Sequence, residues 1–268
     1  MIIKELKDLR YLSWNKTRQS SGTAGSYLKS YAFSSGKKVY YKLSNFDSEN
    51  GVFGFEAINE IISGRIMDIL GYNHLEYNLV HALIIIDGKE YETYLNSSFD
   101  FKEKGESKIT LENCYSLSKE DGEDILSFIK RIGFIDDIYK MIIIDFLINN
   151  KDRHGANIEI VYNNKTKKYR LAPLFDQGLS FLSPYYKESD ILKYNPKEEK
   201  KANSYIGSSD LKSNLINIVP KEYLPNINMD YDYIFKDLED IVDKTYLSKA
   251  KELLKDRWEK LENIRNKK

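Results

Sequence analysis

The sequence predicts an α+β protein with a small, β-rich N-terminal lobe that carries one main helix and a larger, mostly α-helical C-terminal lobe. Short segments rich in β-branched and aromatic residues dominate the first hundred residues. Helical periodicity dominates from residue 121 onward. The charged, glycine-containing stretch FDFKEKGES lies between the two patterns and places the lobes at residues 1–100 and 101–268.

The composition narrows the class of protein. The 41 basic and 41 acidic residues cancel, so no global field would draw the chain to nucleic acid or to an anionic membrane. The single Cys114 cannot form an intramolecular disulfide, and with three histidines the chain shows no His/Cys metal cluster. No apolar run approaches the roughly 20 residues of a membrane helix, and the N-terminus does not resemble a signal peptide. We expect a cytoplasmic protein.

In the N-terminal lobe, two hairpins and one helix are predicted. Asp87-Gly88 is a dipeptide that favours a tight hairpin turn, and Gly71 is placed to end the helix. Apolar residues in the helix recur at steps of three and four. The first hairpin comprises 27–33 and 38–46, the helix 53–70, and the second hairpin 80–86 and 90–95.

The C-terminal lobe is predicted to contain four helices and one hairpin. The second of these helices has one continuous apolar face, and the polar turn NNKTKK joins the two strands of the hairpin. The polar stretch 186–201 is predicted to be a solvated surface loop. The helices are expected at 121–131, 134–150, 230–242 and 246–264, and the strands at 158–162 and 169–175.

The motif NNKDRHGAN, residues 149–157, follows the apolar helix directly and precedes a short strand. A carboxylate at Asp152 would accept or orient the proton of an attacking hydroxyl, and Asn157 would offer an amide oxygen to Mg²⁺. Asp176, in LAPLFDQGLSF, adds a second metal-seeking carboxylate after the hairpin, and Gly178 would allow a sharp turn behind it. Arg153 is expected to be an exposed loop residue, and His154 to brace the loop through hydrogen bonds.

DRHGAN at 152–157 and RLAPLFD at 170–176 resemble the HipA-like serine/threonine kinases, members of the protein-kinase-like superfamily. The order D-R-H-x-x-N also resembles phosphoinositide kinases. The resemblance implies a two-lobed kinase fold, ATP as phosphoryl donor, Asp152 as catalytic base with His154 beside it, and Asn157 and Asp176 as magnesium ligands.

The same resemblance extends to the N-terminal lobe. It implies that Lys42 in VYYKLS reaches the ATP phosphates and pairs with Glu60, with Glu56 as the rival. The segment YLNSSFD resembles the hinge whose backbone binds adenine, here at Asn96 and Ser97. The loop QSSGTAGS would approach the phosphates and carry a regulatory autophosphorylation site at Ser20, Ser21 or Thr23. The loop residues expected to bind nucleotide are Ser21, Gly22, Thr23, Ala24, Gly25 and Ser26.

These features predict an ATP-dependent phosphotransferase that acts on Ser/Thr hydroxyls of a protein substrate. The family resemblance further implies a toxin-antitoxin relationship and an antitoxin-like protein partner, with no direct binding to nucleic acid or membrane. Two alternatives stay open: a small-molecule or lipid kinase of the same superfamily, and a catalytically idle nucleotide-binding or partner-binding module.

Overall fold

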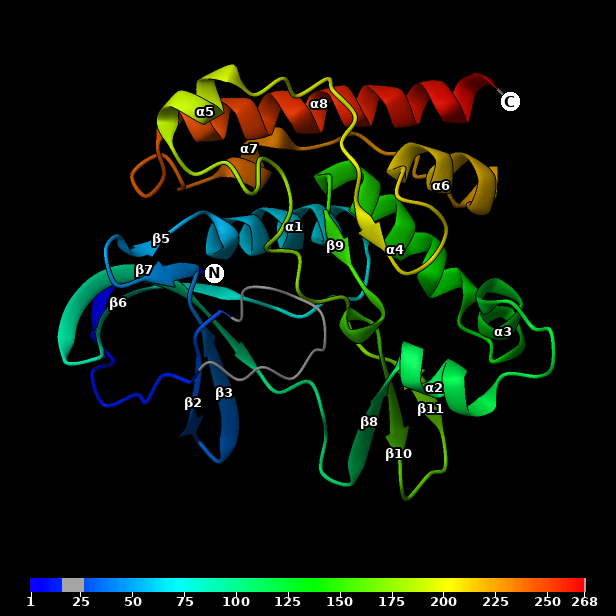
Figure 1. Cartoon of the computed structure of the whole chain (residues 1–268), viewed down its shortest axis with the longest axis horizontal. Coiled ribbons are helices and arrows are strands. Elements are labelled where there is room, and N and C mark those ends of the chain that lie inside the picture. The colour runs from blue at the N-terminus through cyan, green and yellow to red at the C-terminus, as the bar shows by residue number, and fades with distance from the viewer. Residues whose placement is uncertain (16–26, 268) are drawn as a thin grey trace.

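The structure, a computed structural model, describes residues 1–15 and 27–267. It is a mixed α+β fold with one large sheet and several helices, which confirms the predicted class. In Figure 1 the large sheet and the long C-terminal helix lie on opposite sides of the molecule, with helix α1 (Glu56–Leu70) between them. The predicted phosphate-binding loop, including Ser20 and Ser21, lies outside the described residues. The division into two lobes at residue 100 stays a prediction.

The large sheet has five strands in the order β1-β6-β7-β3-β2. All neighbours are antiparallel except β1 and β6, which run parallel. Both predicted hairpins are present, but β1 was missed because its polar sequence, IIKELKD, has no strand signal apart from its first residues. The strands are β1 (Ile2–Asp8), β2 (Lys29–Ser34), β3 (Lys37–Lys42), β6 (Asn78–Ile86) and β7 (Lys89–Phe99).

Local sequence explains the turns and the helix of this region. Asp87 and Gly88 both have positive φ angles, 51° and 79°, as the two-residue turn between β6 and β7 requires. Gly71 ends α1 in the left-handed conformation. A small additional hairpin, β4 (Asn45–Asp47) with β5 (Gly51–Phe53), precedes α1.

The central part of the chain combines helices with a second sheet of order β11-β10-β8. The predicted hairpin between β10 and β11 is present, and β8 adds an unpredicted third strand. The elements are β8 (Glu106–Thr110), α2 (Leu111–Ser118), α3 (Ile125–Arg131), α4 (Ile135–Ile148), β9 (Asp152–Arg153), the 3₁₀ turn η1 (Gly155–Asn157), β10 (Glu159–Asn163) and β11 (Tyr169–Leu171).

Two predictions for the C-terminal part were wrong. The stretch 186–201 contains a short helix, and Ile191 and Tyr194 are buried, so apolar residues hidden among charges anchor it to the core. The helix expected over 230–242 is only five residues long, and Asp237 takes a positive φ of 61° after its end. The elements are α5 (Glu188–Lys193), β12 (Asn203–Ser204), α6 (Leu211–Ile218), η2 (Lys221–Tyr223), α7 (Tyr231–Phe235) and α8 (Lys244–Lys267).

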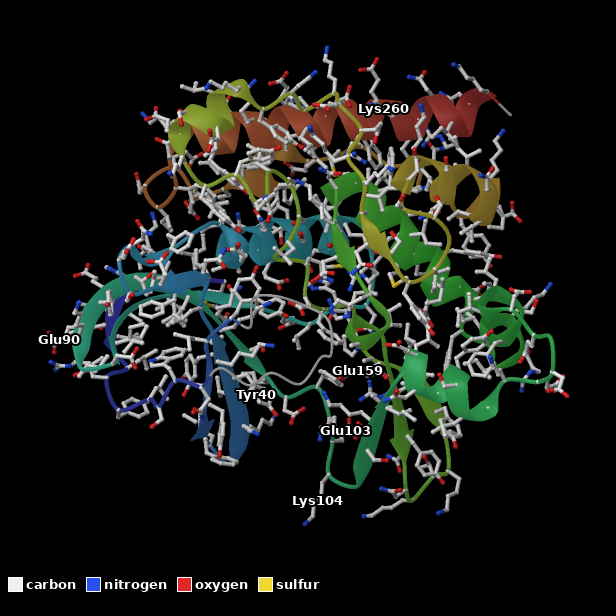
Figure 2. The ribbon with its side chains drawn as sticks, in the orientation of Figure 1. Tyr40, Glu90, Glu103, Lys104, Glu159 and Lys260 are labelled. Atoms are coloured by element: carbon white, nitrogen blue, oxygen red, sulfur yellow. The ribbon has the colours of Figure 1, made fainter. Side chains whose placement is uncertain are left out.

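One continuous core joins α1, α4 and α8 to the inner face of the sheet, and a smaller cluster covers the other face. Many charged side chains lie at the periphery, and Figure 2 shows Glu90 at the outer end of the sheet and Lys260 on α8; Glu60, Asp145 and Arg153 are buried exceptions. Within residues 1–15 and 27–267, no helix combines the length and apolar character needed to cross a membrane.

Candidate active site

The loop after α4 is fixed by buried asparagines that precede the DRH motif. Asn149 ends the helix with a φ of 54°, a left-handed conformation that asparagine tolerates. Asn150 Nδ2 donates to Asp145 Oδ1 at 2.8 Å, and Asn150 Oδ1 accepts the main-chain N–H of Asp152 at 3.1 Å. These contacts set the position of Asp152 from inside the core.

Arg153 was predicted to be exposed, and this was wrong. Its side chain is 2% exposed and its guanidinium binds both carboxylate oxygens of Asp145 in α4. Burial lowers the pKa of Arg153, but Asp145, together with Asp176 and Glu60, outweighs burial and raises it overall. Arg153 also donates to the main-chain oxygen of Phe175 at 2.9 Å, so it joins the loop carrying Asp152 to the residue before Asp176.

Arg153→Met should lower the free energy of unfolding by about 3–5 kcal/mol, because it leaves the buried Asp145 without its counter-ion. Chemical denaturation of both proteins measures the difference. Arg10→Met is the matched control: Arg10 pairs with Asp8 at the surface, where such pairs contribute about 0–1 kcal/mol. Equal losses in the two variants would show that the Arg153 pair is not structural.

Lys42, Glu60 and Asp176 converge from three different elements. Lys42 Nζ lies 3.5 Å from Glu60 Oε1 and also contacts Asp176 Oδ1. Glu60 Oε2 accepts the main-chain N–H of Gln177 at 2.9 Å, which ties α1 to the segment carrying Asp176. Strand β3, helix α1 and the segment after β11 therefore meet at one buried cluster of charges.

The charges of this cluster shift one another's pKa values. Burial lowers the pKa of Lys42, but Asp176 and Glu60 together raise it above its ordinary value. Burial raises the pKa of Asp176, but Lys42 and then Lys29 outweigh burial and hold it low. For Glu60, burial is the largest effect and outweighs the attraction of Lys42, so the pKa of this carboxyl group is raised. Lys42 is thus charged at neutral pH and Asp176 is ionised beside it.

Glu56, the alternative partner predicted for Lys42, belongs to a different cluster of hydrogen-bonded side chains. Its Oε1 accepts hydrogen bonds from Asn45 Nδ2 at 2.7 Å and from the Tyr186 hydroxyl at 2.8 Å. Tyr27 also donates to Glu56 at 3.4 Å, and its ring lies 5.0 Å from Lys42 Nζ. The structure therefore pairs Lys42 with Glu60, and sequence spacing alone gave no sign of Tyr27.

Asp176 itself, and not Gly178, makes the sharp turn predicted here, with a φ of 63°. Gly178 instead allows close packing: a Cβ atom on it would lie 3.1 Å from Glu56 Cβ, so Glu56 would have to shift to accommodate it. A non-glycine residue in the left-handed region is uncommon and often marks a functional position.

Asn157 is oriented for an oxygen-seeking ligand. Its Nδ2 donates to the main-chain oxygen of Asp152 at 3.0 Å, so the amide oxygen is the end that could accept a metal. Asp176 keeps its second carboxylate oxygen beyond the Lys42 contact. Amide and carboxylate oxygens suit Mg²⁺. Within the described ranges no three His, Cys, Asp or Glu side chains group to hold a metal.

Asp152 lies between two side chains. Its Oδ1 accepts from Asn203 Nδ2 at 3.0 Å, and its Oδ2 lies 3.7 Å from His154 Nε2. His154 therefore lies beside the carboxylate at a distance longer than a hydrogen bond, and its predicted bracing of the loop through hydrogen bonds stays a prediction. Asn203 was missed, because it is 51 residues away in the chain and has no local signal. Lys29 was missed too, although it lies directly opposite Lys42 in the β2-β3 pairing and so shares its face.

Asn96 and Ser97 lie inside β7, paired with Lys42 and Tyr41 of β3 on one side. On the other side they pair with Leu79 and Asn78 of β6. The chain leaves the sheet only after Phe99, near the end of the predicted hinge segment YLNSSFD and beyond the two residues singled out in it. The buried Asn96 side chain lies on the same face as Lys42, and its Oδ1 has no hydrogen-bond partner among the described residues.

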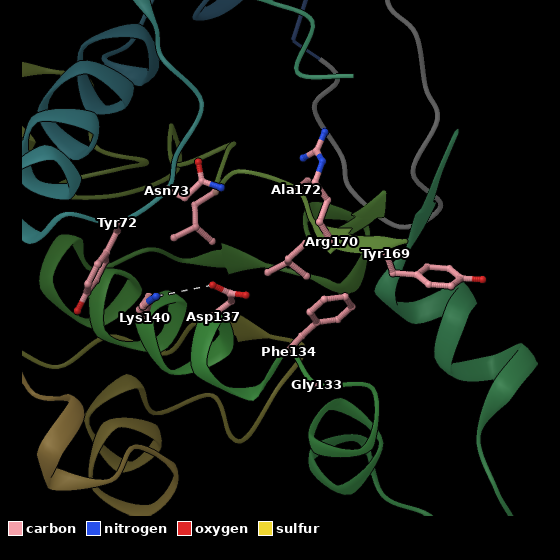
Figure 3. A pocket seen from close by; sticks show the side chains of 11 residues that line it. Tyr72, Asn73, Gly133, Phe134, Asp137, Lys140, Tyr169, Arg170 and Ala172 are labelled. Atoms are coloured by element: carbon pink, nitrogen blue, oxygen red, sulfur yellow. Dashed lines mark ion pairs between the residues drawn. The ribbon is translucent and has the colours of Figure 1, made fainter. Parts of the chain in front are cut away.

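A separate cavity of about 320 Å³ opens between the end of α1, the start of α4 and the strand β11. Figure 3 shows Lys140 and Asp137 paired on one side of it, below Tyr72 and Asn73. No residue proposed for catalysis lines this cavity.

Comparisons with known proteins give a match in structure and none in sequence: no family model matches the chain, and neither does any curated protein. The crystal structure of the Helicobacter pylori proinflammatory kinase CtkA superimposes with a TM-score of 0.72 at 16% identity, covering 97% of this chain and 96% of that one. The HipA structure of Shewanella oneidensis MR-1, in complex with HipB and operator DNA, gives a TM-score of 0.47 at 15% identity over 94% of this chain and 68% of that one. The chain therefore has the fold of a solved kinase over nearly its whole length, in agreement with the kinase fold that its motifs imply.

Proposed function

We propose that the chain is an ATP-dependent phosphotransferase whose acceptor is a Ser/Thr hydroxyl of a protein. The convergence of Lys42, Glu60 and Asp176 beside the loop of Asp152 carries this proposal. A fold by itself does not fix an activity, but this cluster contains the charged groups that phosphoryl transfer requires, in positions that face one another.

Asn157 and Asp176 would hold magnesium together with ATP, and the metal would neutralise phosphate charge. Lys42 would exchange its contact with Asp176 for contacts with oxygens of the ATP phosphates, while Glu60 would keep the Lys42 ammonium in place. Asp152 would accept the proton of the acceptor hydroxyl. The acceptor oxygen forms a bond to the γ-phosphorus as the bond to the β–γ bridging oxygen breaks, which leaves ADP and a phosphoester; the proton passes to solvent.

We propose that adenine binds to the main chain of Phe99 and not to that of Asn96 or Ser97. Asp100 donates its main-chain N–H to Lys38, so the alternation of an antiparallel pair turns the main-chain groups of Phe99 away from β3. Strand β6 begins at Asn78, opposite Ser97, and does not reach Phe99. Tyr40, labelled in Figure 2, lies two residues before Lys42 on the same face and offers a ring for adenine to contact.

Incubation with ATP and Mg²⁺, followed by intact and peptide mass spectrometry, tests the proposal. We expect a phosphoryl group on the chain, within the loop of Ser20, Ser21 and Thr23, and consumption of ATP that stops when EDTA removes the metal. Transfer to added protein, compared with lipid or small-molecule acceptors, separates the kinase classes. Unmodified chain together with unconsumed ATP would contradict the proposal. The antitoxin-like partner and the cytoplasmic location stay predictions from the sequence.

A further inference from the structure

We infer that Asn203 is a positioning residue that holds the Asp152 carboxylate in the orientation that receives the acceptor hydroxyl. This inference rests on the proposed function and assigns a role to a residue outside the motifs that led to it. The observation behind it is the hydrogen bond from Asn203 Nδ2 to Asp152 Oδ1 at 3.0 Å, made across the two-stranded pair of β9 and β12.

The backbone holds Asn203 in register with Asp152. The strands run parallel, with Asn203 opposite Asp152 and Ser204 opposite Arg153. The main-chain N–H of Asn203 donates to the oxygen of Lys151 at 2.8 Å, and that of Tyr205 donates to the oxygen of Arg153 at 2.8 Å. These two bonds lie on either side of Asp152, so the main chain from which the Asn203 side chain reaches the carboxylate is held in place.

The residues around β12 anchor it further. Ala202 and Ile206, on either side of the strand, are buried, and the Ala202 N–H donates to the Ser209 oxygen at 2.9 Å. The ring of Tyr205 packs so closely on the catalytic loop that a Cβ atom on Gly155 would lie 3.0 Å from it. The strand is therefore part of the wall of the site, although the Asn203 side chain itself is exposed at its surface.

The geometry divides the two carboxylate oxygens between two tasks. A carboxylate rotates easily about its last bond. The hydrogen bond from Asn203 occupies Oδ1 and removes that freedom, while Oδ2, next to His154 at 3.7 Å, stays open for a hydroxyl. An amide donor fixes the orientation without adding a charge beside the base. Small errors in placing a reacting group cost large factors in rate, so a loose carboxylate would slow transfer without weakening ATP binding.

Asn203→Leu tests this, because leucine has a similar branched shape and no donor. We expect the rate of phosphoryl transfer at saturating Mg-ATP to fall on the order of 10- to 100-fold, with an unchanged half-saturating ATP concentration and unfolding temperature. Asn203→Gln, which keeps the amide, should recover part of the rate. Ser204→Ala, in the same strand but without a hydrogen bond to Asp152, is the matched control and should behave as wild type.

A double-mutant cycle separates positioning from a general structural role. In the Asp152→Asn background, Asn203→Leu should cause no further loss, because the group that it orients is gone. Additive losses, or a wild-type rate in Asn203→Leu, would overturn the inference and leave the proposed function standing. Absence of transfer by the wild-type chain would instead overturn the proposed function, and this inference with it.

Discussion

Asp152→Asn should lower the rate of phosphoryl transfer from ATP by roughly 10²–10⁴-fold while the fold and Mg-ATP binding stay intact. The substitution keeps the size of the side chain and removes the oxygen charge that would accept the acceptor's proton. Asp152 is partly exposed, and its ion pair with His154, at 3.7 Å, is partly exposed too, so little stability depends on its charge. Rates at saturating ATP, with nucleotide binding measured by calorimetry, give the two quantities.

Asp121→Asn is the control for that variant, because it makes the same chemical change in an exposed turn away from the site. A wild-type rate in Asp152→Asn would remove Asp152 from the mechanism. A loss of ATP binding equal to the loss of rate would assign Asp152 to nucleotide binding instead of proton transfer.

Lys42→Met should lower the free energy of unfolding by about 3–5 kcal/mol at neutral pH and abolish measurable transfer. The Lys42 side chain is 13% exposed and that of Glu60 is fully buried, so removing the ammonium leaves Glu60 and Asp176 without the cation between them. Denaturant unfolding of the two proteins measures the stability change. Lys37→Met, an exposed lysine of the same strand, should change stability by less than about 0.5 kcal/mol.

The contact between Lys42 and Asp176 also predicts how the loss of stability in Lys42→Met depends on pH. The pKa of Asp176 is held below its ordinary 3.8, so its contribution to stability is present above that pH and is lost as the pH falls through the folded value. The pKa of Lys42 is raised, so its contribution is lost only in strongly alkaline solution. The difference between wild type and Lys42→Met should therefore be greatest between about pH 5 and 10 and should shrink in acid. A second change, Glu60→Gln, should restore part of the stability of Lys42→Met.

Much of this fold follows from local sequence. Asp87-Gly88 predicts its turn because both residues accept positive φ angles, and Gly71 predicts the end of α1 for the same reason. Strands β1 and β8 were missed because they are polar and gain their stability from partners distant in the chain: β1 pairs with β6, and β8 with β10. Such pairing leaves little trace in the segment itself.

Part of the site could be predicted from the sequence because a buried charged residue requires a partner of opposite charge. Asp145 lies within the apolar run MIIIDFLI, and a buried carboxylate requires a partner, so the sequence contained a signal for the burial of Arg153 that was not used. Asn203 had no such signal, because only the folding of the segment after Asp176 brings it beside Asp152. We propose Phe99 in place of Asn96 and Ser97 as the residue whose main chain binds adenine, because β7 stays paired with β3 beyond its predicted end.

A crystal structure of the chain with Mg²⁺ and a non-hydrolysable ATP analogue tests the central claim most directly. We expect metal density against the Asn157 amide oxygen and the Asp176 carboxylate, Lys42 Nζ on phosphate oxygens, and the γ-phosphate in front of Asp152. A nucleotide bound elsewhere, for instance in the cavity between α1, α4 and β11, or one that leaves Lys42 and Asp176 without contacts to phosphate or metal, would contradict it.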